Sequence, residues 1–215
     1  MNYPDGRKHN NKTIYTGKRG MSLESDINDT NKYYLDNDIA VIYKKPTPTK
    51  VIKLDGNRIK DGFYEIPSTT DYNGIYKGKY VDFEAKETKS KTSFSLSNIH
   101  NHQIKHLERI INHGGISFII IRFTSLNETY LLMTKDFINY IYNNERKSIP
   151  YDYIKGKGYI IKERLNPRLD YIEILNNLEV FKWKNYLKRK KVLGWEKPLV
   201  SLKSLNYLEE KKKLN

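Results

Sequence analysis

The feature that most constrains the fold of this chain is a short segment in which apolar and charged residues alternate. The order is Val81, Asp82, Phe83, Glu84, Ala85 and Lys86. Successive side chains of a β-strand point to opposite faces, so this alternation predicts a strand with an apolar packed face and a charged face that is free for chemistry. The pair Lys77-Gly78 precedes the segment and suits a tight turn, which predicts a hairpin over residues 71–86.

The rest of the chain predicts an α/β fold with a mixed β-sheet flanked by helices. Continuous apolarity predicts a buried strand at 116–123. Apolar spacing after Ser22, which can cap a helix, predicts a helix at 22–35. A second helix is expected between Asn98, as its cap, and Gly114-Gly115, which would end it. The remaining expected elements are strands at 39–43 and 128–133 and helices at 135–143 and 169–178.

Residues 44–66 are expected to project from this fold as a basic loop or hairpin. Pro46 and Pro48 oppose both a helix and a central strand. The pair Asp55-Gly56 suits a tight turn between two short strands. We therefore divide the chain into a flexible polar arm at 1–19, one folded domain at 20–178 and a basic extension at 179–215.

Composition narrows the chemistry and the compartment. The chain has no cysteine, which excludes a disulfide framework, thiolate zinc ligands and thiol nucleophiles. A catalytic metal would therefore need oxygen or imidazole ligands. The longest apolar run, at 116–121, is far shorter than the roughly 20 residues that a membrane-spanning helix needs. The polar start of the chain shows no secretory signal, and the cytoplasm is the expected location.

The formal net charge of +14 predicts a polyanionic partner, because an excess of ammonium and guanidinium groups attracts phosphate chains at long range. Nucleic acid is the leading candidate, and a membrane surface or packing within a ribosome are the alternatives. Biased genomic base composition would enrich lysine over arginine, but it gives no reason for acidic residues to be so much fewer. Half of the excess charge lies after residue 177. There Trp183 and Trp195 could stack on bases, or the segment could form a solvated helix face.

Asp71, Glu84 and Lys86 form a candidate site for phosphodiester hydrolysis. This reaction needs a metal ion that polarises the phosphate and activates a water, and a cation that stabilises the charge developing on phosphorus. Two carboxylates offer the oxygen ligands that Mg²⁺ prefers, and Glu84 and Lys86 would project from one strand face about 7 Å apart. The spacing alone leaves open a solvated charge ladder. A second copy, Glu87-Thr88-Lys89, is out of phase with the charged face.

An Asp followed by Glu-x-Lys resembles the PD-(D/E)xK nuclease superfamily, and longer strings resemble one of its families. These strings are, in order, Arg19-Gly-Met-Ser-Leu-Glu24, Asn31-Lys-Tyr-Tyr-Leu35, Lys44-Lys-Pro-Thr-Pro48, Pro67-Ser-Thr-Thr-Asp-Tyr-Asn-Gly74, Asp82-Phe-Glu-Ala-Lys-Glu-Thr88 and His102-Gln103. On these strings, over roughly residues 3–178, the chain is similar to the RecU family of Holliday-junction resolvases. The tail beyond Leu178 has no counterpart among them.

The resemblance implies a restriction-endonuclease-like fold and an endonuclease that depends on Mg²⁺, with Mn²⁺ as the alternative ion. The motif positions that correspond to the metal site are Thr69, Asp71, Glu84 and Gln103. Lys86 corresponds to the lysine that stabilises the transition state, and Glu84 and Asp71 join it as the expected catalytic residues. Glu24 corresponds to an acidic position near the site, where it would orient water or the lysine.

The same resemblance implies a role on DNA in recombination and repair. Proteins of this family are homodimers whose paired active sites nick two strands of like polarity across a four-way junction. Residues 44–66 correspond to the stalk that enters the centre of the junction. RecA and the RuvAB branch-migration machinery are the expected protein partners. In this chain the segment between Pro48 and Pro67 is a few residues shorter than usual and Arg58 is its only arginine, which puts the stalk contacts in question.

Three other interpretations stay open at this point. A noncatalytic basic protein would bind DNA or RNA architecturally, and a restriction-type nuclease of the same superfamily would recognise a specific sequence. The third is a zinc site, because His102 and His106 have the spacing of zinc ligands on a helix. The chain lacks cysteine and the glutamate that follows the first histidine in metalloproteases, which favours a solvated helix that faces phosphate.

Overall fold

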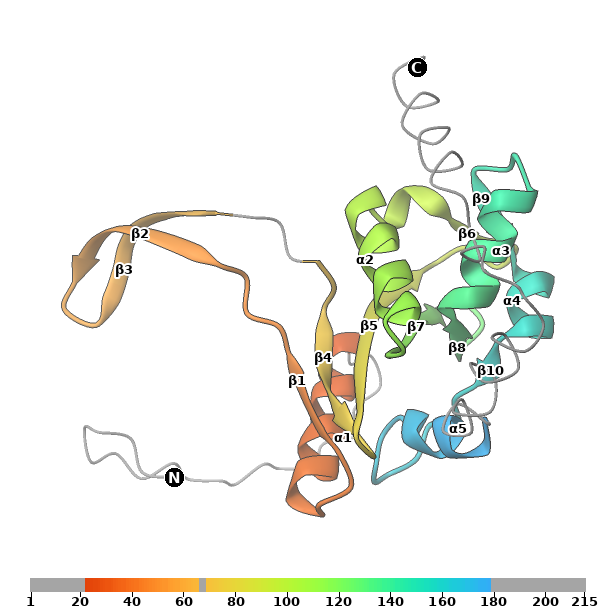
Figure 1. Cartoon of the computed structure of the whole chain (residues 1–215), viewed down its shortest axis with the longest axis horizontal. Helices are drawn as coiled ribbons and strands as arrows, with labels where there is room; N and C mark the ends of the chain where they lie inside the picture. The colour runs from red at the N-terminus through yellow and green to blue at the C-terminus, as the bar shows by residue number, and fades with distance from the viewer. Residues whose placement is uncertain (1–21, 66–68, 179–215) are drawn as a thin grey trace.

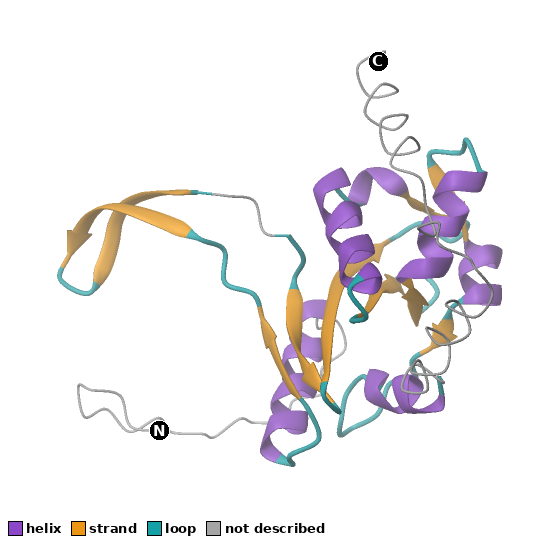
Figure 2. Ribbon diagram, viewed as in Figure 1, coloured by secondary structure: helices purple, strands orange, loops and turns teal. Residues whose placement is uncertain are grey.

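The computed structural model describes residues 22–65 and 69–178, which form a β-sheet with helices on both faces (Figure 1, Figure 2). The helices are α1 (Leu23–Asp36), the 3-10 turn η1 (Leu96–Asn98), α2 (Asn101–Asn112), α3 (Thr134–Asn143), α4 (Tyr151–Lys157) and α5 (Tyr171–Asn177). The strands are β1 (Val41–Lys44), β2 (Thr49–Asp55), β3 (Arg58–Tyr64), β4 (Tyr72–Tyr76), β5 (Lys79–Thr88), β6 (Ser93–Ser95), β7 (Ile116–Phe123), β8 (Glu128–Met133), β9 (Ser148–Pro150) and β10 (Tyr159–Ile160). The arm expected at 1–19 and the extension expected at 179–215 lie outside the described residues.

The central sheet is mixed, as predicted. Its strands are ordered β1-β4-β5-β7-β8-β10; β5 and β7 pair in parallel, and the other neighbours pair in antiparallel. One face packs with α1 and α5, and the other packs with α2, α3 and α4, which gives two apolar cores separated by the sheet. Because both cores meet on β7, this strand is buried along its whole length. The predicted α/β class, with a mixed sheet flanked by helices, is confirmed.

The strand β5 has the predicted alternation but not the predicted exposure. Val81 and Phe83 are fully buried in the core on the α1 side, as expected. On the opposite face Asp82 and Glu84 are also fully buried, because side chains of α2 contact both carboxylates. The expectation of a free charged face was therefore wrong at these two positions. Further along the strand, Lys86 keeps 26% of its side chain exposed.

Two hairpins follow the predicted turns. Strands β4 and β5 are joined through Lys77 and Gly78, whose φ angles are 46° and 71°. Two successive positive φ angles match the twist of a hairpin. Strands β2 and β3 form the hairpin expected within 44–66, with Gly56 in its turn, and it projects far from the sheet in Figure 1. Every residue of β2 and β3 is exposed, so this hairpin has no core of its own.

The first turn of α1 is attached to the end of β5. Ser22 caps the helix as predicted, because its hydroxyl accepts from the N–H of Ser25 at 3.3 Å. The N–H of Leu23 donates to Oε1 of Glu87 at 2.7 Å. Glu87 belongs to the out-of-phase copy of the Glu-x-Lys pattern, and it contacts α1 instead of the charged face of β5. This contact places the start of α1 beside the strand that carries the predicted site.

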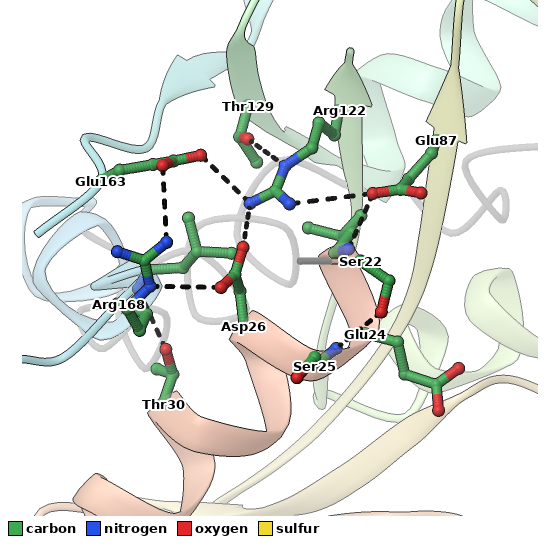
Figure 3. A network of polar contacts seen from close by, with 12 residues as sticks. Ser22, Glu24, Ser25, Asp26, Thr30, Glu87, Arg122, Thr129, Glu163 and Arg168 are labelled. Carbon is green, nitrogen blue, oxygen red and sulfur yellow. Dashed lines mark hydrogen bonds and ion pairs between the residues drawn. The ribbon is translucent and has the colours of Figure 1, made fainter. Parts of the chain in front are cut away.

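A buried network of ion pairs fixes the next turn of α1 (Figure 3). Asp26 pairs with Arg122 of β7 at 2.7 Å and with Arg168 at 3.1 Å. Arg122 also donates to Thr129 of β8 at 3.1 Å and pairs with Glu163 at 3.2 Å. Each buried charge therefore has a partner of opposite sign, which is the condition under which charges are tolerated in a protein interior.

Helix α2 begins later than predicted. Asn98 belongs to η1, and α2 starts at Asn101 with His100 as its cap. The side chain of Gln103 accepts from the N–H of His100 at 3.0 Å, and this contact fixes the start of the helix. Gly114, at a φ of 82°, follows its end as predicted. Strands β6, β9 and β10 and helix α4 were not predicted. Within the described ranges, no helix has the length and apolarity needed to span a membrane.

Candidate functional site

The β4–β5 hairpin brings the two predicted carboxylates together. Tyr72 of β4 pairs with Phe83 of β5, so Asp71, just before β4, lies beside Glu84 across the hairpin. Oδ2 of Asp71 accepts from the backbone N–H of Ala85 at 3.0 Å, which holds the Asp71 side chain against β5. The register of the hairpin thus closes the gap that separates Asp71 and Glu84 in the sequence.

Glu84 has one saturated and one unsatisfied oxygen. Its Oε1 receives the ammonium of Lys86 at 2.6 Å and the amide nitrogen of Gln103 at 2.8 Å. Its Oε2 is buried and has no hydrogen-bond partner within residues 22–65 and 69–178; the amide nitrogen of Asn31 is the other such side-chain atom there. Because a buried polar atom without a partner costs about 1–3 kcal/mol, Oε2 needs an explanation.

The electrostatics at Glu84 favour a proton or a cation. Burial and the neighbouring Asp71 carboxylate raise the pKa of Glu84 to about 7, against the opposing effect of Lys86. Two ionised carboxylates are both acceptors, so they cannot satisfy each other, whereas a shared proton or cation removes their repulsion. Carboxylate oxygens are the ligands that Mg²⁺ and Mn²⁺ take. The residues present therefore fit a divalent ion, which Glu84 and Asp71 would hold through their carboxylate oxygens.

The other two predicted metal-site residues lie at different places. Gln103 is beside Glu84, but its amide nitrogen faces Glu84 and its oxygen accepts from the N–H of His100. In this arrangement Gln103 orients Glu84 instead of offering an oxygen to an ion. The hydroxyl of Thr69 accepts from the ammonium of Lys45 at 3.1 Å, which joins Thr69 to a neighbouring cluster.

An open pocket borders the predicted site where Asp71 and Lys86 line it, while Glu84 does not line it. It has a volume of about 240 Å³ and is lined by Ser22, Leu23, Glu24, Asp71, Tyr72, Ala85, Lys86 and Glu87. The first turn of α1 forms one wall, and the end of β5 forms another. Glu24, the acidic residue expected near the site, lies on the α1 wall and pairs with Lys44. A ligand in this pocket can reach both Asp71 and Lys86.

A second polar cluster on the same face of β5 was not predicted. Asp82, two residues before Glu84, pairs with Lys45 at 2.6 Å and with Nε2 of His106 at 3.1 Å. The sequence pattern placed Asp82 on the charged face of its strand, and it placed Lys45 in the Lys-Lys-Pro-Thr-Pro string. Their pairing depends on the fold and had no signal in the sequence.

The histidines of α2 do not support a zinc site in the described part of the chain. His106 contacts Asp82, and the ring of His102 stacks on that of His100 with centroids 5.5 Å apart. No group of three or more His, Cys, Asp or Glu side chains in residues 22–65 and 69–178 is placed to hold a metal ion. A metal at Asp71 and Glu84 would therefore take its further ligands from amide, hydroxyl or water oxygens, as Mg²⁺ does.

The family model and the curated relatives that match this chain point to the same family. The model of the RecU family, described as recombination protein U, matches residues 18–177. A relative named Holliday junction resolvase RecU from Leuconostoc mesenteroides is 46% identical over 197 residues, which covers 83% of this chain and 97% of the relative. A protein of the same name from a Geobacillus species is 47% identical over 193 residues and covers 82% and 96%.

Among solved structures, the chain is similar to Hjc, a Holliday junction resolvase of Archaeoglobus fulgidus. The TM-score is 0.38 and the identity 13%, over 66% of this chain and 95% of Hjc. The family match covers more than half of the chain, and both curated relatives exceed 40% identity over most of their length. The chain therefore belongs to the RecU family.

Proposed function

We propose that this protein is a structure-selective endonuclease that resolves four-way (Holliday) DNA junctions in the cytoplasm. It hydrolyses phosphodiesters with a divalent metal and introduces paired symmetric nicks during recombination and repair. Relatives at 46% and 47% identity carry the name Holliday junction resolvase. The observation that carries the proposal is Oε2 of Glu84, a buried oxygen without a partner among the described residues, beside Asp71.

The chain holds its proposed metal ligands in place before substrate binds. When bound, Mg²⁺ or Mn²⁺ would polarise the scissile phosphate and lower the pKa of an attacking water. Asp71 and Glu84 are the proposed ligands, and Thr69 is a further candidate; Gln103, the other residue expected at the metal, is proposed to orient Glu84 in this arrangement. Gln103 donates to Oε1 of Glu84, and the N–H of Ala85 donates to Asp71, so both carboxylates have a fixed orientation.

Lys86 is the residue proposed to stabilise the transition state. Its ammonium lies 2.6 Å from Oε1 of Glu84, but 26% of its side chain is exposed, whereas Glu84 is fully buried. Because the lysine side chain is flexible and borders the pocket, the ammonium can turn from Glu84 to an oxygen of a phosphate in the pocket. There it would stabilise the negative charge that develops during hydrolysis.

The surface of the molecule supports a DNA junction as substrate. The net charge of +14 favours binding to backbone phosphates, and selectivity then depends mainly on the shape of the junction. The projecting β2–β3 hairpin carries exposed basic residues, Lys50, Lys53, Arg58 and Lys60. We propose that it enters the centre of the junction. Contacts of this hairpin with RecA and RuvAB-type proteins stay a prediction.

We propose that the working form is a homodimer, because a four-way junction presents two equivalent scissile phosphates related by approximate two-fold symmetry. Val41 and Tyr43 of the edge strand β1 and Ile75 of β4 share one face of the sheet and are 47%, 53% and 58% exposed. A group of large apolar side chains at a sheet edge favours association. Sedimentation of the wild type and of the Tyr43→Glu, Ile75→Lys variant tests this; a dimer and a monomer are expected, respectively.

A labelled four-way junction, incubated with the protein in Mg²⁺ or in EDTA, tests the activity. With Mg²⁺, and not with EDTA, nicks are expected at symmetric positions in two junction strands of like polarity. A linear duplex of the same sequence should stay uncut. Binding without any metal-dependent nick would instead support the noncatalytic basic protein. Equal cutting of the linear duplex would support a restriction-type nuclease.

A further inference from the structure

Asp82 is a fully buried carboxylate to which the proposed mechanism gives no role. It lies two residues before Glu84 on β5, so both side chains are on the face of the sheet that α2 covers. An ionised carboxylate in a protein interior is costly unless it is paired and hydrogen-bonded. Its partners therefore indicate what the position contributes.

The partners of Asp82 come from several segments of the chain. Its Oδ2 accepts from the ammonium of Lys45 at 2.6 Å and the hydroxyl of Tyr80 at 3.0 Å, and Nε2 of His106 lies 3.1 Å away. Its Oδ1 accepts from the hydroxyl of Thr70, which is also fully buried. Lys45 precedes the β2–β3 hairpin, Thr70 follows it, and His106 is on α2. One carboxylate thus ties both ends of the hairpin and α2 to β5.

These contacts bear directly on the loop that carries two of the proposed metal-site residues. Thr70 stands between Thr69 and Asp71 in the chain. The ammonium of Lys45 contacts the hydroxyls of both Thr69 and Thr70, and its backbone N–H donates to the carbonyl of Asp71 at 2.8 Å. The position of the Asp71 backbone is therefore set by residues that Asp82 holds.

The contact with α2 acts on the other proposed ligand. His106 is three residues after Gln103, so both lie on the same face of the helix. Gln103 donates to Glu84, while His106 contacts Asp82. Asp82 and Glu84 thus fix α2 against β5 at two neighbouring points, and the orientation of Glu84 depends in part on the Asp82 contact.

The hairpin explains why such a tie would be needed. All residues of β2 and β3 are exposed, so contacts at the base determine how the hairpin is held. Lys45 is at this base, and 13% of its side chain is exposed, whereas Asp82 has none exposed. A displacement of the hairpin would therefore be transmitted to the site through the ion pair of Lys45 and Asp82.

We propose that Asp82, through its pair with Lys45, is a positioning residue that keeps the loop at 69–71 in register with Glu84 and so completes the divalent-metal site. This inference rests on the proposed function, because it assumes that Asp71 and Glu84 bind the metal. It assigns to Asp82 no contact with the metal or with DNA. Loss of the pair should therefore weaken metal binding without removing any ligand.

Calorimetric titration of the full-length, metal-free protein with Mn²⁺, in the absence of DNA, tests the proposal. Glu84→Gln should remove Mn²⁺ binding. Asp82→Asn and Lys45→Met should each raise the dissociation constant for Mn²⁺ about tenfold or more, as loss of residues that orient metal ligands does. The double variant Lys45→Met, Asp82→Asn should show the same rise in the dissociation constant for Mn²⁺. This variant removes both charges of the pair, so it leaves neither of them unpaired in the interior.

Nicking of a four-way junction supplies a second readout. For Asp82→Asn, the Mn²⁺ concentration at half-maximal rate should rise by the same factor, and saturating Mn²⁺ should restore most of the rate. Junction binding in EDTA should change less than about threefold. A purely structural defect would lower the folded fraction and would not be reversed by more metal, so the folded fraction is followed by circular dichroism.

Two variants serve as controls. Glu128→Gln alters a carboxylate of β8 that accepts from Tyr130 and Tyr151, and Lys79→Met removes an ammonium that donates to the carbonyl of Gly114. Both should bind Mn²⁺ like the wild type. If Asp82→Asn and the double variant also bind Mn²⁺ like the wild type while Glu84→Gln does not, the positioning role is wrong and the metal site stands. If Glu84→Gln binds Mn²⁺ normally, the proposed function itself fails.

Discussion

Two buried carboxylates of this molecule are satisfied to different degrees. Asp26 of α1 receives a guanidinium at each oxygen, Arg122 at Oδ2 and Arg168 at Oδ1 (Figure 3). Glu84 of β5 receives Lys86 and Gln103 at Oε1, while no described residue donates to Oε2. Solvent does not account for the difference, because the two side chains are 2% and 0% exposed.

The difference separates a structural ion pair from a site with a missing partner. At Asp26, two guanidinium groups compensate one buried carboxylate and also pair with Glu163, and the network links α1 to β7 and β8. At Glu84, a second carboxylate adds negative charge, and the pKa of Glu84 rises to about 7 as a result of burial and of Asp71. The first arrangement is complete within the chain. The second becomes favourable when a cation binds.

The largest effect is expected from removing the proposed catalytic groups. Lys86→Ala should lower the rate of junction nicking about 100- to 1,000-fold, because the charge on phosphorus loses its stabilising cation. Glu84→Ala should reduce nicking to background. Gel-shift titration in EDTA should show junction binding close to that of the wild type. Nicking by either variant at the wild-type rate would remove Glu84 and Lys86 from the mechanism.

The second-largest effect is expected from disrupting the ion-pair network around Asp26. Arg122→Met leaves Asp26 buried with one of its two cations, which should cost about 3–5 kcal/mol of unfolding free energy. Urea denaturation measures this loss. The slope of the unfolding free energy against urea concentration should be unchanged. The fraction that remains folded should bind Mn²⁺ as the wild type does. If the stability were unchanged, the network in Figure 3 would contribute little to the attachment of α1.

The local elements near the site could be predicted from the sequence because their signals are local. The alternation at 81–86 specifies a strand, and Lys77-Gly78 suits the two positive φ angles of its hairpin turn. Together they place Asp71 beside Glu84. Pro46 and Pro48 likewise indicated that the following segment leaves the sheet, which the β2–β3 hairpin confirms.

The burial of the charged face could not be predicted, because it depends on where α2 packs. The pairs of Asp82 with Lys45 and of Asp26 with Arg122 join residues far apart in the chain, and a single sequence gives no signal of such contacts. The start of α2 was missed for a related reason. Its cap uses Gln103, whose amide also contacts Glu84, so the helix boundary is linked to the site.

The third prediction concerns pH and sharpens the contrast at Glu84. The pKa of Glu84 is raised from 4.5 to about 7 in the folded chain, so the unfolded state releases this proton first as pH rises. In metal-free protein the ionisation of Glu84 therefore does not lower the free energy of unfolding below pH 4.5. Between pH 4.5 and about pH 7 it lowers the free energy of unfolding progressively, and above about pH 7 the loss is complete. At about 1.4 kcal/mol per pKa unit, the full cost is roughly 3 kcal/mol.

Glu84→Gln should accordingly stabilise the metal-free protein by up to about 3 kcal/mol at pH 8 and have little effect at pH 4.5. Thermal unfolding in EDTA at the two pH values measures this stabilisation, and Mn²⁺ should stabilise the wild type but not the variant. A variant that is less stable than the wild type at pH 8 would show that Glu84 is satisfied within the chain.

The smallest effect is expected from a change at the edge of the Asp26 network. Thr129→Val keeps the shape of the side chain but removes the hydroxyl that accepts from Nε of Arg122 at 3.1 Å. Because Thr129 is 2% exposed, water cannot replace the hydroxyl, and a loss of about 1–2 kcal/mol in unfolding free energy is expected. Junction nicking and Mn²⁺ affinity should not change. A shift in Mn²⁺ affinity would mean that the two carboxylates are coupled through α1 and β5, and the separation between structural network and metal site would then be wrong.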